Sequence, residues 1–143
     1  MSKINIMSLV GLNENCKNIY KVNIDGKILI FDCGIKYAPD KVYGIDYVIP
    51  DFSYLVKNKE NIVGLFISHP HHENMGALTD LLKLIPELQV YASPYTCEII
   101  KMQCAEEKVQ IKNLNVIPAH KKIDFKNFSV FPFNVTHSSP ETY

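Results

Sequence analysis

The feature that most constrains the fold is a segment in which an apolar run, a histidine-rich cluster and a helical pattern follow one another without a break. Residues 63–67 form a continuous apolar run of the length of a buried strand. Leucine and isoleucine recur at helical intervals within residues 76–85, Pro86 ends that helix, and residues 89–92 return to strand character. The segment predicts a strand, loop, helix, strand unit, which is typical of α/β folds.

Three strands are predicted before this unit, over residues 6–10, 20–24 and 27–31. The last two are separated by Asp25 and Gly26, a pair that strongly favours a two-residue hairpin. Residues 35–50 contain proline and glycine and follow neither periodicity, so we expect a long surface loop there. A short helix over residues 54–56, capped by Asp51, is expected next.

The rest of the chain alternates between helix and strand. A helix is predicted over residues 95–107, followed by strands near residues 114–117 and 128–135. The sequence contains no internal repeat and no linker that would divide it. Strands first, followed by alternating helices and strands, predict one α/β domain with a mixed sheet.

Composition limits the classes of function. The chain has 15 basic and 15 acidic residues, so there is no net positive charge to hold a phosphate backbone, and any RNA contact must be local or supplied elsewhere. The 4 cysteines lack CxxC spacing, which favours reduced packing thiols over disulfides or a zinc knuckle. Neither a signal peptide nor an apolar stretch of bilayer-spanning length is recognisable. We therefore expect a cytoplasmic protein that does not contact a membrane.

The densest cluster of potential metal ligands lies at residues 68–74, Ser-His-Pro-His-His-Glu-Asn, between the predicted strand and helix. Functional groups often collect at such strand ends. In an extended segment the imidazoles of His69 and His71 project to the same side and could converge on one divalent ion, whereas His72 would point away. Solvated loop histidines would give the same pattern, so both interpretations stay open at this point.

Other candidate residues favour structural roles. His120 matches no ligand spacing and is expected on a surface loop. Ser138 and Ser139 suggest a nucleophile, but no G-x-S-x-G elbow is present, so hydrogen-bonding support is expected. Four phenylalanines could stack on bases, although core packing is the preferred interpretation because strand aromatics usually bury area; they are Phe125, Phe128, Phe131 and Phe133.

A resemblance to a known family extends these inferences. Residues 69–74 resemble the HxHxDH motif of metallo-β-lactamase fold hydrolases, with both leading histidines matched. Residues 44–55, Gly-Ile-Asp-Tyr-Val-Ile-Pro-Asp-Phe-Ser-Tyr-Leu, closely resemble the segment that precedes this motif in ribonuclease J, and they are far more specific than HxH. Residues 32–34, 76–78 and 134–138 also look like that family, so the resemblance runs along essentially the whole chain.

The resemblance implies a fold as well as a family. The implied architecture is α/β, a metallo-β-lactamase-like αββα sandwich of two similar halves, with a mixed β-sheet and flanking helices. Residues 1–143 would be the N-terminal portion of that domain, about its first half, and the β-CASP and C-terminal domains of the family would not be part of this chain. One apolar face of the sheet would then lack its usual cover, so we expect that either the chain is a fragment of a longer protein or it hides that face by forming a homo-oligomer.

The resemblance also implies which residues bind metal. His69, His71 and His137 would hold the first of two ions, usually zinc and sometimes manganese, which together activate a bridging water for attack on an RNA phosphodiester. Glu73 stands where the family has an aspartate that binds the second metal and orients the water, so Glu73 is the candidate catalytic residue and a further candidate ligand. Asn74 stands where the family has a histidine, and an amide oxygen is a weak zinc ligand compared with an imidazole nitrogen. The second metal position is therefore expected to be impaired.

Two functions follow from this pattern. The first is a ribonuclease J like, metal-dependent RNA hydrolase whose activity is weakened or lost through Glu73 and Asn74. The alternative is a non-catalytic paralogue that binds RNA or pairs with an active ribonuclease J subunit. A third class, the hydrolases of small esters or thioesters that share the fold, matches HxH but not residues 44–55 and ranks well behind.

Overall fold

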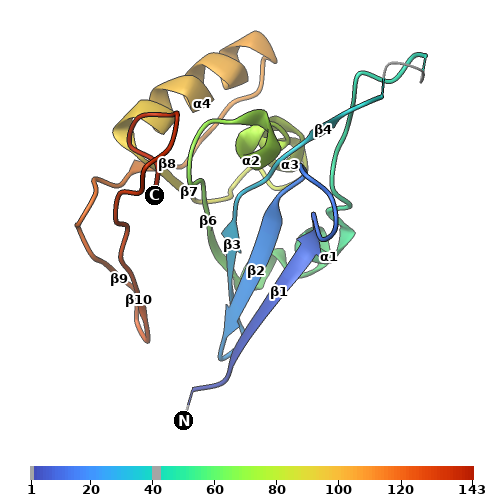
Figure 1. The fold of residues 1–143 in the computed structure, drawn as a ribbon. Coiled ribbons are helices and arrows are strands. Elements are labelled where there is room, and N and C mark those ends of the chain that lie inside the picture. The colour runs from blue at the N-terminus through green and yellow to red at the C-terminus, as the bar shows by residue number, and fades with distance from the viewer. Residues whose placement is uncertain (1, 40–42) are drawn as a thin grey trace.

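The computed structural model describes residues 2–39 and 43–143, and its central element is a six-stranded mixed sheet of order β1-β2-β3-β6-β7-β8 (Figure 1). The strands β1, β2 and β3 pair antiparallel, whereas β3, β6, β7 and β8 run parallel. Their bounds are β1 Ile4–Val10, β2 Ile19–Ile24, β3 Lys27–Phe31, β6 Ile62–Phe66, β7 Val90–Ala92 and β8 Leu114–Val116. The predicted α/β class with a mixed sheet is confirmed.

Helices pack against one face of this sheet and enclose the larger core. Their bounds are α1 Ser53–Lys57, the 3-10 turn η1 Lys59–Asn61, α2 His72–Met75, α3 Leu78–Leu84 and α4 Pro94–Glu106. Side chains alternate across β3, so that Ile28 and Ile30 enter this core while Leu29 faces the other side of the sheet. Among the described residues, no helix has the length and apolar character needed to cross a membrane.

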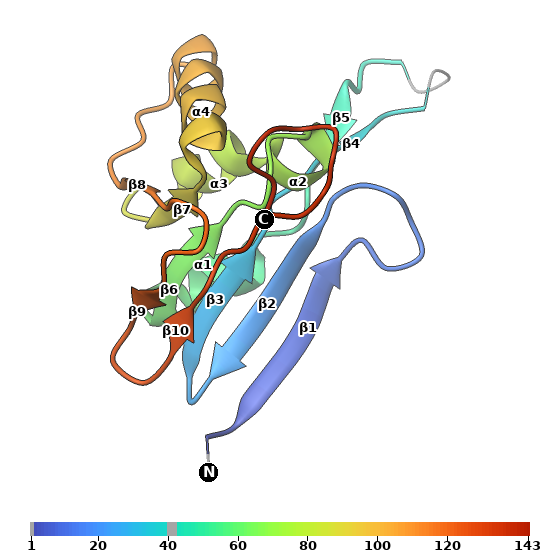
Figure 2. The same cartoon turned by 60° about the vertical axis from the view of Figure 1, so that its left-hand side comes forward.

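The opposite face of the sheet is covered in part by the C-terminal segment. Leu29, Phe66 and Ile117 are buried there, and a small antiparallel ribbon of β9 (Ile123–Asp124) and β10 (Ser129–Val130) brings Phe125 and Phe128 against them. The ring of Phe125 meets that of Phe66 edge-on at 6.3 Å between centroids. Figure 2 shows this segment, in orange to red, passing over the sheet toward α2. The apolar face is therefore less open than the resemblance implied.

The hairpin between β2 and β3 forms where the sequence predicts it. Ile24 pairs with Lys27, and the two turn residues Asp25 and Gly26 have φ of 50° and 87°. Positive φ at both positions is what a two-residue turn of this hand requires, and aspartate followed by glycine tolerates it. The predicted strands at residues 6–10, 63–67, 89–92 and 114–117 are also confirmed, within two residues at each end.

The prediction of an irregular loop at residues 35–50 is wrong in part. A two-stranded antiparallel ribbon, β4 (Lys36–Tyr37) with β5 (Tyr47–Val48), lies within this segment and projects from the body in both views (Figures 1 and 2). Residues 40–42 of the predicted loop lie outside the described part. Strands of two residues are too short for alternation to be recognised in sequence.

The strand predicted at residues 128–135 is also largely wrong, because regular pairing ends after Val130. Pro132 lacks the N–H that a sheet ladder needs, which explains why alternation alone does not continue the strand. Phe131 and Phe133 are 53% and 59% exposed, so the prediction that they pack in the core is wrong, while Phe125 and Phe128 do pack against the sheet.

Two helix starts differ from the prediction. The helix predicted over residues 76–85 is preceded by a separate turn, α2, which begins inside the histidine cluster at His72. The N-cap position of α1 is occupied by Phe52 and not by Asp51. Asp51 still serves this end, because its Oδ1 accepts from the backbone N–H of Ser53 at 2.9 Å. The amino-acid sequence gives only a weak signal for the exact residue at which a short helix begins.

The prediction of reduced cysteines is confirmed. All four cysteines are free, and Cys33, Cys97 and Cys104 are buried. Desolvation raises the pKa of the Cys97 thiol to about 11, which keeps that thiol protonated and unreactive.

Candidate metal centre

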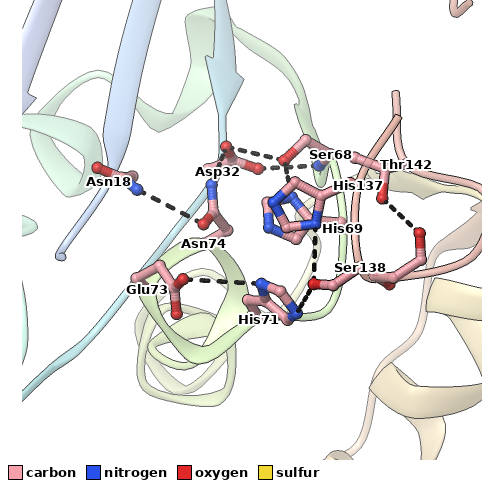
Figure 3. A network of polar contacts seen from close by, with 11 residues as sticks. Asn18, Asp32, Ser68, His69, His71, Glu73, Asn74, His137, Ser138 and Thr142 are labelled. Atoms are coloured by element: carbon pink, nitrogen blue, oxygen red, sulfur yellow. Dashed lines mark hydrogen bonds and ion pairs between the residues drawn. The ribbon is translucent and has the colours of Figure 1, made fainter. Parts of the chain in front are cut away.

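The candidate site lies beyond the carboxyl ends of the neighbouring parallel strands β3 and β6 (Figure 3). Asp32 directly follows β3, and Ser68 and His69 follow β6. Parallel strands end at the same edge of a sheet, which is where open α/β sheets gather functional side chains. The backbone N–H of Asp32 donates to the carbonyl of Phe66 at 2.9 Å and extends the pairing of the two strands up to the site.

Three histidines meet at this edge. One ring nitrogen from each of His69, His71 and His137 lies within 4.8 Å of the other two, an arrangement that could hold a metal ion. The ring centroids are 4.6 Å apart for His69 and His71, 4.4 Å for His69 and His137, and 4.9 Å for His71 and His137. Three nitrogen donors with an open side suit a catalytic-type zinc position. The residues present therefore fit one ion.

The protonation of His69 favours metal binding. Its side chain is 8% exposed, and desolvation, followed by the nearby His137 and His71, lowers its pKa below the ordinary 6.5. An imidazole must be unprotonated to act as a ligand. His71 is half-buried and His137 is exposed, so the cluster opens to solvent on their side.

The C-terminal segment brings His137 to the site without regular secondary structure. The backbone N–H of Tyr143 donates to the carbonyl of Ser68 at 3.2 Å, and its hydroxyl donates to the carbonyl of Ile117 at 2.6 Å. Glu141 accepts from the N–H of Tyr95, at the start of α4, at 2.7 Å. These contacts anchor the loop to both strands and helix, so residues about 70 apart in sequence converge.

Ser138 lies between two of the histidines, with Oγ at 3.5 Å from Nε2 of His71 and at 3.4 Å from Nδ1 of His137. This is the supporting position that the sequence favours over a nucleophile. Ser139 donates to the carbonyl of Pro140 instead. A cleft opens beside this loop, and its lining includes His71, Glu73 and Tyr95.

Glu73 and Asn74, which the resemblance assigned to a second metal, lie in different surroundings. Oε1 of Glu73 is 3.7 Å from Nδ1 of His71, so its carboxylate lies at the margin of the cluster. Asn74 is buried, and its Nδ2 donates to Oδ2 of Asp32 at 2.7 Å while its Oδ1 accepts from Asn18 at 3.5 Å. The amide of Asn74 is thus engaged within the protein, and the residues present do not fit a second ion that uses it.

The remaining histidines lie apart from the cluster. His72 packs edge-on against Tyr37 of β4 at 5.6 Å between ring centroids, in agreement with the prediction that it points away. His120 is exposed in the loop before β9, as predicted, with its ring 6.3 Å from that of Phe131.

Sequence reasoning missed the network around Asp32. Its carboxylate is buried and accepts hydrogen bonds from both the backbone and the hydroxyl of Ser68 as well as from Asn74. Desolvation raises the pKa of this carboxyl, and the donors oppose that rise. Its φ of 62° lies in the left-handed region, where non-glycine residues are uncommon and often functional. The available signal was a lone aspartate directly after a predicted strand.

Sequence comparison finds that the chain is similar to curated ribonucleases J. Ribonuclease J 1 of Streptococcus pyogenes serotype M3 is 36% identical over 141 residues, which cover 98% of this chain and 25% of that protein. Ribonuclease J 2 of Staphylococcus epidermidis is 35% identical over 140 residues (97% and 25%), and ribonuclease J of Mycoplasma pneumoniae is 33% identical over 139 residues (96% and 24%). The chain thus spans about a quarter of the length of these curated relatives. No protein-family model matches it.

Among solved structures, a flavo di-iron protein variant from Thermotoga maritima superposes with a TM-score of 0.54 at 15% identity, covering 90% of this chain and 36% of that one. At this identity the likeness shows the fold alone, which is that of the metallo-β-lactamases. The identity to the curated relatives extends over nearly the whole sequence. The chain therefore belongs to the ribonuclease J family and has the metallo-β-lactamase fold.

Proposed function

We propose that this chain is the N-terminal portion of a metallo-β-lactamase domain that binds one metal ion, zinc or manganese, through His69, His71 and His137 and takes part in hydrolysis of RNA. The observation that carries the proposal is the convergence of the three imidazole nitrogens within 4.8 Å. RNA as substrate is taken from the relatives that are named ribonuclease J. The β-CASP and C-terminal domains would be no part of these 143 residues, and the protein would act in the cytoplasm.

In this proposal the three histidines hold the ion at a position that is open to solvent, and Glu73 lies beside it. An ion held there would polarise a water or a phosphoryl oxygen. His69 supplies its ligand atom from a buried, desolvated position, while His71 and His137 face the solvent from which RNA approaches. Glu73, with its carboxylate 3.7 Å from His71, would orient that imidazole or accept a proton from water near it.

The hydrolase is expected to be slower than a two-metal enzyme of the same fold. A second ion normally stabilises the other oxygen of the displacement. Here the amide of Asn74 is committed to Asp32 and Asn18, and Glu73 is longer by one methylene than aspartate. Displacements of about 1 Å at a reacting centre can reduce the rate by roughly 100-fold.

A nuclease assay of the protein tests the proposal. The substrate is an end-labelled single-stranded RNA, and the variants are His69→Ala and, as a matched control, His120→Ala, whose ring is exposed and outside the cluster. We expect metal-dependent cleavage in the wild type and in His120→Ala, and at least a ~100-fold loss in His69→Ala. Equal cleavage in all proteins, with or without a chelator, would contradict the metal-dependent mechanism.

The engagement of Asn74 favours a second candidate function, a non-catalytic paralogue that binds RNA or pairs with an active ribonuclease J subunit or with its own copy. In that case the wild type would cleave no RNA, and His69→Ala would leave RNA binding and subunit pairing unchanged. A gel-shift assay with the same RNA and a pull-down with an active ribonuclease J subunit separate the two functions.

A further inference from the structure

We propose that Ser68, held by Asp32, sets the tautomer of His69 so that its Nε2 is the metal-ligating nitrogen, and that Asn74 is a positioning residue that holds Asp32 for this task. The use of Nε2 by a metal rests on the proposed function, whereas the tautomer does not. The residues involved are drawn in Figure 3.

The carboxylate of Asp32 accepts hydrogen bonds from Ser68 and Asn74. The backbone N–H of Ser68 donates to Oδ1 at 2.8 Å, and the amide Nδ2 of Asn74 donates to Oδ2 at 2.7 Å. Amide N–H groups can only donate, so Oδ1 and Oδ2 both accept here, and the donors from Ser68 and Asn74 favour the ionised carboxylate against the effect of burial. The hydroxyl of Ser68 completes the set by donating to Oδ2 at 3.1 Å. Its single proton is thereby committed to Asp32.

The hydrogen bond from the hydroxyl of Ser68 to Asp32 also determines which nitrogen of His69 carries the ring proton. Oγ of Ser68 lies 2.8 Å from Nδ1 of His69, a hydrogen-bond distance. Because the hydroxyl proton points to Asp32, Oγ must accept here, and Nδ1 must carry the ring proton. A neutral imidazole has one proton, so Nε2 keeps its lone pair. Histidine ligands of metals commonly donate their other N–H to such an outer partner, which fixes the ring and makes it more basic.

Asn74 is built into the support of this chain of hydrogen bonds. Its side chain is buried at the end of α2, and the carbonyl of Asn74 accepts from the N–H of Cys33, the residue after Asp32, at 2.6 Å. Its Oδ1 faces Asn18, so the amide is oriented with Nδ2 toward Asp32. Asn74 therefore holds Asp32 through both its side chain and its backbone, which is a different role from that of a metal ligand.

The tautomer can be measured in the metal-free 143-residue chain with ¹⁵N-labelled histidine. Long-range ¹H–¹⁵N correlation spectra near pH 8, well above the ordinary histidine pKa of about 6.5, distinguish a ring protonated at Nδ1 from one protonated at Nε2. His69→Gln assigns the signals. We expect the Nδ1–H form of His69 in the wild type. An Nε2–H form would overturn the proposal, whether or not the protein binds metal.

Three variants test the individual roles. Ser68→Ala removes the acceptor and is expected to return His69 to a mixture of tautomers, whereas Ser68→Thr keeps the hydroxyl and should keep the Nδ1–H form. Asn74→Asp is nearly isosteric but replaces the donor with an acceptor next to Asp32, and it should also disturb the tautomer. Circular dichroism checks folding. A Nδ1–H signal that is unchanged in Ser68→Ala would overturn the role of Ser68, and one unchanged in Asn74→Asp would overturn that of Asn74.

Zinc affinity, measured by competition with a chromogenic chelator, links the tautomer to the metal. Loss of an outer hydrogen-bond partner typically weakens metal binding by about 10–100-fold, which is the expectation for Ser68→Ala, while Ser68→Thr should stay within about threefold. If the wild type binds no zinc but shows the expected tautomers, the proposed metal function fails while the hydrogen-bond assignment stands. If all variants bind zinc equally, the positioning role fails and the metal function stands.

Discussion

The residue type of Asn74 and its surroundings indicate different roles. An amide at this position indicates a weakened metal ligand, whereas its buried environment is that of a structural group. The sequence correctly indicates that an amide is a poor zinc ligand, but it cannot tell where the amide points. The structure buries it between Asp32 and Asn18. By contrast, the convergence of His69 and His71 was predictable because residues two apart in an extended segment share a side.

Asn74→Ala should therefore destabilise the fold. The change removes one of the donors to the buried carboxyl group of Asp32, and a buried acceptor left without its partner costs about 1–3 kcal/mol. Urea unfolding measures the difference. Asn5→Ala, at an exposed position of β1, is the matched control and should change the free energy of unfolding by less than about 0.5 kcal/mol. Equal effects of the two substitutions would contradict the buried network.

At the scale of elements, the strands that the sequence predicts well are those with long apolar runs or a defined turn. The β2–β3 hairpin and β6 are of this kind. The position of α2 was not predictable, because it depends on contacts with the segment after β3. Gly34 lies so close to α2 that an added Cβ would be 1.6 Å from the carbonyl oxygen of Glu73.

Gly34→Ala should displace α2 and disturb the histidine cluster with it. The overlap cannot be relieved by moving a flexible side chain, because the atom it meets belongs to the backbone, and we expect a loss of about 3 kcal/mol or more. Gly26→Ala is the control, since its Cβ meets nothing within 4 Å and only the positive φ is unfavourable, at about 1–2 kcal/mol. Urea unfolding compares them, and a Gly34→Ala loss no larger than that of Gly26→Ala would contradict this account.

The start of α1 gives a pH-dependent prediction. Hydrogen bonds from the side chain and then the backbone of Ser53 lower the pKa of Asp51 below the ordinary 3.8. A carboxyl whose folded pKa is lowered stabilises the protein above its unfolded pKa, and that stabilisation is lost as the pH falls through the folded pKa. Asp51→Ala should thus lower the melting temperature at pH near 7, and the difference should shrink below about pH 3.8.

Thermal unfolding of wild type and Asp51→Ala over a series of pH values measures this effect. Asp51→Asn serves as the control, because it keeps an acceptor oxygen for Ser53 without the charge. A difference between wild type and Asp51→Ala that stays constant over the whole series would show that the charge of Asp51 does not contribute.

At the scale of the whole molecule, the fold class followed from the order of strands and helices, and the family followed from residues 44–55 together with the histidine motif. The course of the C-terminal segment did not follow from either. Alternation predicted a strand through Phe131 and Phe133, but Pro132 interrupts the pairing and both rings are exposed. The long-range anchoring by Tyr143 and Glu141, which brings His137 to the site, has no local signal in the sequence.

The central claim is that one metal ion binds where the three histidines converge, and metal content tests it most directly. Elemental analysis would follow dialysis of zinc-loaded wild type, His71→Ala and His72→Ala against metal-free buffer. His72 is the matched control, because it is the next residue and packs against Tyr37 outside the cluster. About one zinc per chain is expected in wild type and His72→Ala, and near zero in His71→Ala. No zinc in the wild type, or equal zinc in all three proteins, would contradict the account.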